Sequence, residues 1–146
     1  PLSNMAPLVL SRNGETLASI GSSGGRKIVN CNAQVAINLV RYGMGMQEAI
    51  AAPRIDASTA ELLLSARLPA STRDALARMG HRVAVRDERL FTGDFASPCG
   101  VLRLADGGFA GGADPYYFPA MAEGVAREAV GGRRYAVDDA APSVPP

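Results

Sequence analysis

The chain has 146 residues, of which 47% are hydrophobic and 20% charged, and its formal net charge is +1. This composition is typical of one globular domain or part of one, and scattered Lys and Arg residues give no basic footprint for nucleic acid. No apolar run is long enough to span a membrane, and the first residues lack the charged and apolar regions of a signal peptide.

A β-hairpin is the first element that the sequence predicts. Apolar runs at 7–11 and 16–20 flank Asn13-Gly14, a dipeptide that favours a two-residue hairpin turn. The apolar spacing of residues 26–42 then predicts a helix with a broad buried face, which ends at Gly43.

The middle of the chain alternates short helices and strands. The sequence predicts a helix at 46–51 that ends before Pro53, a strand at 61–66, and a strand at 82–86. Between these strands, Ser71 is expected to cap a helix at 71–79 that Gly80 closes.

A loop at 87–97 and a second hairpin follow, with strands at 99–104 and 108–111 around Asp106-Gly107. A weak helix at 120–130 leads into a proline-rich tail, which we expect to be disordered or to lie along a partner. Hairpin strands with helices between them predict an α+β domain, in which helices cover an antiparallel sheet.

The stretch GSSGG at 21–25 is the main candidate for chemistry, because it lies between a predicted strand and a predicted helix. Backbone amides there can face an anion at the positive end of the helix dipole. Taken alone, the stretch is also consistent with a tight strand-to-helix turn that needs positive φ. Ser3 and Asn4, taken alone, are equally consistent with a turn or cap before the first strand.

Other site classes find little support in the sequence. One histidine and two distant cysteines do not make a zinc site, so we expect no metal and no cofactor. Cys31 and Cys99 are expected to be buried thiols. Residues 21–27 lack the spacing of a phosphate-binding loop.

A serine hydrolase is the alternative enzyme class, because GSSGG also fits the G-x-S-x-G pattern of a nucleophile elbow. Ser23 would be the nucleophile and His81 its base, with Asp56 or Asp74 orienting the imidazole. His81 directly follows the helix-ending Gly80, a place that is typical of an exposed surface imidazole.

Four stretches together resemble the small subunit of the γ-glutamyltransferase (γ-glutamyltranspeptidase) family, which belongs to the N-terminal nucleophile hydrolases. That family carries a proline-leucine-serine-serine-methionine stretch and, about twenty residues later, a glycine-serine-proline-glycine-glycine turn. The matching residues are PLSNM at 1–5 and GSSGG at 21–25, and further agreement lies at 42–54 and at GADP, 112–115. The resemblance covers residues 1–115, and 116–146 form a C-terminal extension.

The chain departs from the family pattern at three places, and the first of them bears on substrate identity. The second motif serine is Asn4, the proline of the glycine turn is Ser23, and Tyr116-Tyr117 stand where family members usually continue with arginine. An amide at position 4 keeps a hydrogen-bond donor but is longer than a hydroxyl, so it would reshape the pocket.

The resemblance implies a four-layer αββα sandwich and acyl transfer by a new N-terminal threonine, which forms when a precursor cleaves itself. It implies that Ser3 and Asn4 bind the α-carboxylate of a γ-glutamyl group, while Gly24 and Gly25 form the oxyanion hole. The threonine of the family precedes the serine motif by some tens of residues, so we expect this chain to be inactive alone.

The implied partners are the large subunit and the N-terminal part of the small subunit of the same precursor, with a γ-glutamyl donor and an amine or water as acceptor. A glutaryl-type acylase of the same superfamily and a catalytically silent fragment remain open as alternatives. The family suggests a periplasmic or extracellular location, and a cytoplasmic one is also possible.

Overall fold

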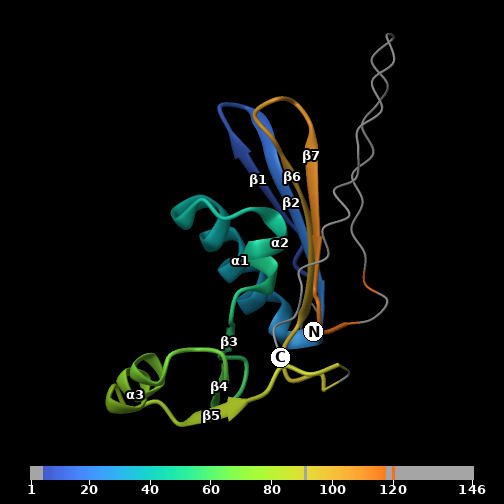
Figure 1. The fold of residues 1–146 in the computed structure, drawn as a ribbon. Coiled ribbons are helices and arrows are strands. Elements are labelled where there is room, and N and C mark those ends of the chain that lie inside the picture. Colours follow the sequence, from blue (N-terminus) through green and yellow to red (C-terminus); the bar gives the residue numbers. More distant parts are fainter. Residues whose placement is uncertain (1–4, 91, 118–119, 121–146) are drawn as a thin grey trace, which may run out of the picture.

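The computed structural model describes residues 5–90, 92–117 and 120, and they form two sheets and three α-helices (Figure 1). The elements in chain order are β1 (Leu8–Arg12), β2 (Glu15–Ser23), the 3-10 turn η1 (Gly25–Lys27), α1 (Ile28–Tyr42), α2 (Met46–Ala51), β3 (Ile55–Asp56), β4 (Leu62–Ser65), α3 (Ala70–Arg78), β5 (Val83–Arg86), β6 (Ser97–Arg103) and β7 (Phe109–Ala113).

The larger sheet is antiparallel and has the strand order β1-β2-β6-β7. Asn13 and Gly14 both have positive φ, 53° and 81°, which is the conformation that a two-residue hairpin turn of this kind requires. The first predicted hairpin is therefore confirmed, and the antiparallel pairing of β6 with β7 confirms the second. The predicted strand at 16–20 continues further, because residues 21–23 pair with β6 from Cys99 to Ser97.

Helices α1 and α2 cover one face of this sheet (Figure 1). The core between them contains Ala18, Ile20, Val35, Leu39, Met46, Ala49 and Ile50. Close packing depends on two glycines, since a Cβ on Gly100 or Gly112 would lie 2.9 Å from Met46 side-chain atoms. Gly43 ends α1 in the left-handed conformation, as the sequence predicts.

The smaller sheet has the order β3-β4-β5 and lies with α3 at one end of the molecule (Figure 1). Strands β4 and β5 are parallel, and β3 is a two-residue strand that the sequence analysis did not predict. The expected cap at Ser71 is wrong, because α3 begins at Ala70 with Pro69 at the N-cap and no side-chain cap. The α+β class with helices packed on an antiparallel sheet is confirmed.

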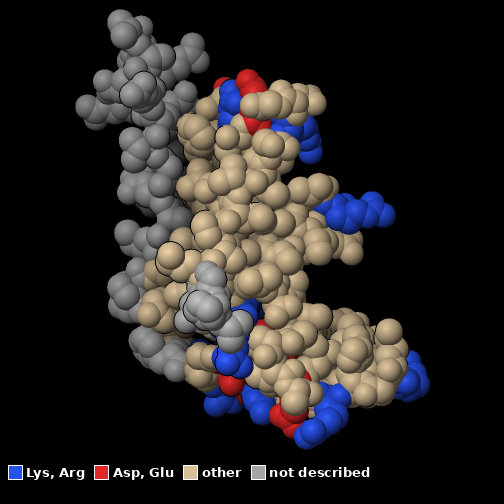
Figure 2. Space-filling model, turned by 180° about the vertical axis from the view of Figure 1, so that it is seen from behind, with Lys and Arg blue, Asp and Glu red and all other residues tan. Residues whose placement is uncertain are grey.

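The second face of the larger sheet carries apolar side chains that no described helix covers. Val9 of β1 is 63% exposed and Phe109 of β7 is 46% exposed. Leu8 and Leu10, the neighbours of Val9 on β1, instead pack against the core. Figure 2 shows most of the charged side chains toward the two ends of the molecule, and one basic side chain projects from the otherwise uncharged surface between them. In the described part of the chain, no helix is both long and apolar enough to cross a membrane.

Candidate active site

The turn from β2 into η1 is built on Gly24, whose φ is 141°. A Cβ at this position would lie 2.8 Å from the Cα and the Cβ of Ala96, so only glycine fits without a shift of the neighbouring backbone. Gly25 follows with a φ of 62° and open space around it. No hydrogen bond between described residues occupies the amide of Gly24 or of Gly25.

A cavity of about 230 Å³ lies next to Gly24. Its wall includes the aromatic side chains of Phe95, Tyr116 and Tyr117, and its polar groups include those of Arg54, Glu88 and Asp114. Ser23 also lines the cavity, whereas Gly25 does not. The cavity therefore combines an apolar wall with a strictly required glycine and a charged floor.

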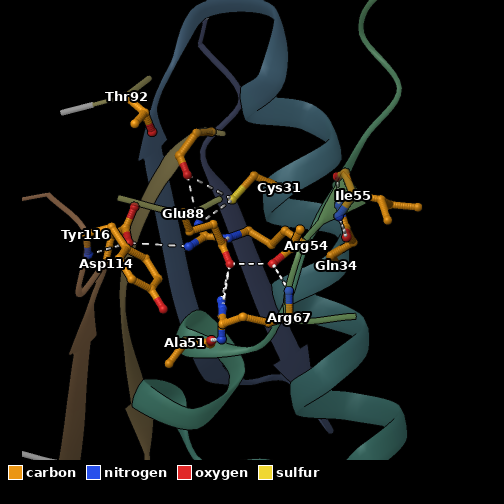
Figure 3. Close-up of polar contacts among 12 residues, drawn as sticks. Cys31, Gln34, Ala51, Arg54, Ile55, Arg67, Glu88, Thr92, Asp114 and Tyr116 are labelled. Atoms are coloured by element: carbon orange, nitrogen blue, oxygen red, sulfur yellow. Dashed lines mark hydrogen bonds and ion pairs between the residues drawn. The ribbon is translucent and has the colours of Figure 1, made fainter. Parts of the chain in front are cut away.

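The charged floor is a buried ion network centred on Arg54 (Figure 3). The side chains of Arg54, Glu88 and Asp114 are 4, 3 and 7% exposed. The guanidinium of Arg54 donates to Glu88 Oε1 at 3.3 Å, to Asp114 Oδ1 at 3.3 Å and to the carbonyl of Ala96 at 2.8 Å. Arg54 thus fixes the residue against which Gly24 packs.

Glu88 connects this network to a second arginine. Its Oε2 accepts hydrogen bonds from the Ser65 hydroxyl at 2.6 Å and from Arg67 Nε at 2.7 Å. The Arg67 guanidinium carbon lies 5.2 Å from the centre of the Tyr116 ring, within the range of a cation–π contact. Two arginines and two carboxylates leave the cluster without net charge.

The charge states of the network follow from its geometry. Burial lowers the pKa of Arg54, but attraction to Asp114 first, and to Glu88 among others, outweighs burial and raises that pKa above its ordinary value. Burial raises the pKa of the Cys31 thiol, although Arg54 opposes the change. Arg54 therefore stays cationic, and Cys31 is a neutral thiol at pH 7.

Two glutamines form hydrogen bonds with the backbone of the residues next to Arg54 and Asp114. The Gln34 amide pairs with the backbone of Ile55, donating to its carbonyl at 2.7 Å and accepting from its N–H at 2.9 Å. Gln47 pairs in the same way with Ala113, with both distances at 3.0 Å. Each helix therefore fixes, through one side chain, the residue next to a buried charge.

The sequence-predicted site residues have different outcomes. The structure places Gly24 at the cavity and Gly25 directly after it, at the start of η1. Ser3 and Asn4 lie outside the described residues. The weak helix at 120–130 and the tail lie outside the described part too, except for Ala120.

The serine hydrolase alternative gains no support from the geometry. Ser23 lines the cavity, but His81 is exposed beyond α3 and is not among the residues of that cavity. Asp56 hydrogen-bonds Ser58 and Asn30, and Asp74 is exposed on α3. No hydrogen bond between described residues joins Ser23 to His81 or His81 to either carboxylate.

The prediction that both cysteines are buried is confirmed for one of them. Cys31 is buried, with its sulfur 3.8 Å from a guanidinium nitrogen of Arg54. Cys99 is exposed, so the prediction that it is buried is wrong. Its position explains this, because alternate residues of β6 face away from the helices, and Cys99 lies on the uncovered face of the sheet.

Sequence reasoning assigned no role to Arg54, Glu88 or Asp114. Arg54 and Asp114 stand in stretches that carry the family resemblance, and the structure joins them by an ion pair across 60 positions. Glu88 lies in a loop without periodicity, which offers no signal of a buried carboxylate. A charged residue inside a family motif was therefore the one available clue.

Comparison with known proteins places the chain in a family. The family model for gamma-glutamyltranspeptidase matches residues 1–120. The glutathione hydrolase proenzyme of Escherichia coli strain K12 is 29% identical over 117 residues, 79% of this chain and 19% of that protein. The acylase ACY 1 proenzyme of Pseudomonas sp. strain V22 is 33% identical over 90 residues, 62% of this chain and 16% of that protein.

Solved structures agree in fold. An acivicin-inhibited gamma-glutamyltranspeptidase matches with a TM-score of 0.68 at 29% identity, over 80% of this chain and 62% of that chain. A cephalosporin acylase from Bacillus halodurans matches with a TM-score of 0.68 at 27% identity, over 76% of this chain and 20% of that chain. The chain spans about a fifth or less of the curated relatives. It belongs to the gamma-glutamyltranspeptidase family and has the fold of N-terminal nucleophile hydrolases.

Proposed function

We propose that this chain supplies the oxyanion-binding and carboxylate-binding half of an active site that cleaves and transfers γ-glutamyl groups from glutathione-like donors. The nucleophile is an N-terminal threonine supplied from outside this chain. Gly24 and Gly25 donate their amides to the carbonyl oxygen that becomes negative during attack, and Ser3 and Asn4 bind the α-carboxylate of the donor.

The chemistry proceeds in two acyl transfers. The threonine hydroxyl attacks the γ-carbonyl, its proton passes to the α-amine of the same residue, and the donor C–N bond breaks as the leaving amine takes up the proton. Water or an acceptor amine then attacks the γ-glutamyl ester and releases the threonine. Both steps pass through a tetrahedral oxyanion, which two amides stabilise by about 3 kcal/mol or more.

Gly24 is the observation that carries this proposal. It lies at a cavity large enough for a small acyl group, it tolerates no Cβ, and its amide is not used by another described residue. A backbone amide can approach a tetrahedral oxygen to about 3 Å only where no side chain intervenes. The ion network holds the carbonyl of Ala96, the residue against which Gly24 packs.

The partners proposed are the large subunit and the N-terminal part of the small subunit of the same precursor. The uncovered apolar face of the larger sheet, with Val9 and Phe109, is where a second sheet of the sandwich would pack. Curated relatives five or more times longer than the matched region supply the length of chain that such a layer needs.

Turnover of p-nitroanilide donors tests the reaction, using the parent protein after self-cleavage. We expect p-nitroaniline release from the γ-glutamyl donor, with KM raised at least about tenfold by Ser3→Ala, the loss expected for a hydrogen bond to a carboxylate. Ser11→Ala, an exposed serine of β1, is the matched control and should leave KM unchanged. No turnover by the wild-type protein despite self-cleavage would rule out the γ-glutamyl assignment.

A glutaryl-type acylase is the second candidate, and the acylase relatives favour it. A glutaryl group keeps the carboxylate but lacks the α-amine. If kcat/KM for glutaryl-p-nitroanilide exceeds that for the γ-glutamyl donor, the acylase assignment replaces the transferase. If neither donor is cleaved, the chain belongs to a catalytically silent protein.

A further inference from the structure

Three aromatic side chains line the cavity beside Gly24, in addition to the groups proposed for the oxyanion. They are those of Phe95, Tyr116 and Tyr117. A cavity of about 150 Å³ holds a benzene ring, and this one, at about 230 Å³, has room for a ring with its substituents. Size and lining together suit a flat apolar group.

The charged residues of the lining already have partners of opposite charge. Arg54 forms ion pairs with Glu88 and with Asp114, both at 3.3 Å. Arg89, which is more exposed, forms one with Asp87 at 2.7 Å. An ionised ligand group would therefore lose its water and gain no free counter-charge from these residues, which is unfavourable. The lining favours a neutral group over an ionised one.

A γ-glutamyl donor has two parts that differ in charge. The glutamyl part carries an α-amine and an α-carboxylate, which are both ionised at pH 7. The amine on the other side of the γ-carbonyl can be neutral and apolar. Because the aromatic wall offers no free counter-charge, it suits this leaving amine and not the ionised groups. Gly24, where we place the reacting carbonyl, belongs to the same lining.

Tyr116 is held in place from two directions. Its backbone N–H donates to Asp114 Oδ1 at 3.0 Å, and the Arg67 guanidinium carbon lies 5.2 Å from the centre of its ring. Arg67 is itself fixed by hydrogen bonds to the Ala51 carbonyl and to Glu88 Oε2, both at 2.7 Å (Figure 3). A surface that is fixed before the ligand arrives loses little freedom on binding. Tyr116 therefore offers a preformed ring for stacking.

We propose that this cavity is the subsite for the leaving amine, that it selects neutral aromatic amines, and that Tyr116 is its specificity-determining residue. The inference rests on the proposed function and names the donors that the site favours, the γ-glutamyl amides of aromatic amines. The amine stacks against Tyr116 while its bond to the γ-carbonyl breaks. It leaves neutral, after it takes up the proton that the threonine α-amine received.

The test compares a donor that has an aromatic amine with one that has none, on the self-cleaved parent protein. Tyr116→Ala should lower kcat/KM for γ-glutamyl-p-nitroanilide about tenfold, because the contact between two rings is lost. kcat/KM for L-glutamine, whose leaving group is ammonia, should stay at the wild-type value. Tyr116→Phe keeps the ring and should keep the wild-type kcat/KM for both donors.

Tyr42→Ala is the matched control, because Tyr42 is 67% exposed at the end of α1 and does not line the cavity. It should leave kcat/KM for both donors unchanged. Equal losses for the two donors in Tyr116→Ala would show that Tyr116 is merely structural and would overturn the inference.

The wild-type protein provides a second test that needs no variant. γ-Glutamyl-3-carboxy-4-nitroanilide adds an ionised carboxylate to the same ring, so its kcat/KM should be at least about tenfold lower than that of γ-glutamyl-p-nitroanilide. An equal or higher kcat/KM would contradict a subsite for neutral amines.

Binding of acetanilide separates a failure of this inference from a failure of the proposed function. Acetanilide is a neutral anilide without a glutamyl group, and saturation-transfer NMR should detect its binding to the wild-type protein and a weaker signal with Tyr116→Ala. If the wild-type protein cleaves no γ-glutamyl donor, the proposed function fails. Equal acetanilide signals from the two proteins, or none from either, would overturn the subsite itself.

Discussion

At the residue scale, buried charge is the most demanding feature of the chain. Arg54 is surrounded by two carboxylates and a carbonyl, and each carboxylate has a further partner of its own, in Ser65 and Arg67 for Glu88 and in the Tyr116 amide for Asp114. Because desolvation of such groups is expensive, the network is stable only while every member is present.

Removal of Arg54 should therefore be far more damaging than removal of a surface arginine. Arg54→Met leaves Asp114 buried beside a hydrocarbon, and we expect the free energy of unfolding to fall by about 3–5 kcal/mol. Arg82→Met, which breaks the exposed pair with Glu61, should cost less than about 1 kcal/mol.

Denaturant unfolding of the two variants of the self-cleaved protein measures the difference. Similar losses in both variants would mean that the buried network contributes no more than a surface pair, and the structural argument for it would be wrong.

At the element scale, helices α1 and α2 each contact the site through a glutamine side chain whose amide forms two hydrogen bonds with a backbone residue, as a neighbouring strand would. Gln47 of α2 extends the hydrogen bonding of β7 by pairing with Ala113, directly before Asp114. Gln34 of α1 does the same for Ile55, directly after Arg54. Helix packing and the position of the buried charges are thereby coupled.

This coupling predicts the effect of Gln47→Leu. The substitution is close in size but leaves the N–H and the carbonyl of Ala113 without these partners, which should lower the free energy of unfolding by about 1–3 kcal/mol. Arg78→Leu, which also replaces a polar side chain by leucine but at an exposed position of α3, should stay within about 0.5 kcal/mol of wild type. A Gln47→Leu protein as stable as Arg78→Leu would contradict the coupling.

Local signals in the sequence were sufficient for much of the fold. Asn13-Gly14 predicted the first hairpin, and Gly43 predicted the end of α1. The parallel pairing of β4 with β5 was not predictable, because it joins segments separated by α3, and the two residues of β3 are too few to show a period. Ser71 was misread as a cap because the helix starts one residue earlier, after Pro69.

In the candidate site too, residues with a local sequence signal were predictable and residues defined by long-range contacts were not. Gly24 could be identified from its motif, because a glycine turn between a strand and a helix is a local pattern. Glu88 could not be identified, since its importance comes from Arg54, a partner on a distant segment. Site residues defined by long-range contacts require the structure.

At the scale of the whole molecule, one face of the larger sheet is covered by no helix among the described residues. Val9 on that face is 63% exposed. If a second layer packs there, Val9→Asp places a charge in an apolar interface and should prevent assembly of the self-cleaved subunits, since an unpaired buried charge is strongly disfavoured.

Size-exclusion chromatography of the processed protein measures this assembly. Val85→Asp, on the exposed side of β5 in the other sheet, is the matched control and should assemble normally. Normal assembly of the Val9→Asp protein would mean that this face stays open to solvent.

The rate of acyl-enzyme formation tests the central claim, that Gly24 provides an oxyanion-binding amide. With γ-glutamyl-p-nitroanilide, Gly24→Ala should lower kcat by about a hundredfold or more, the loss found when one oxyanion donor is displaced. Gly21→Ala, on the strand β2 that leads into Gly24 and with no atom within 4 Å of its Cβ position, should stay within about twofold. Ala96→Gly added to Gly24→Ala removes the contact with the Ala96 Cβ but leaves the equally close contact with the Cα, so it should restore kcat only in part. A Gly24→Ala protein that turns over the donor as fast as Gly21→Ala would contradict the account.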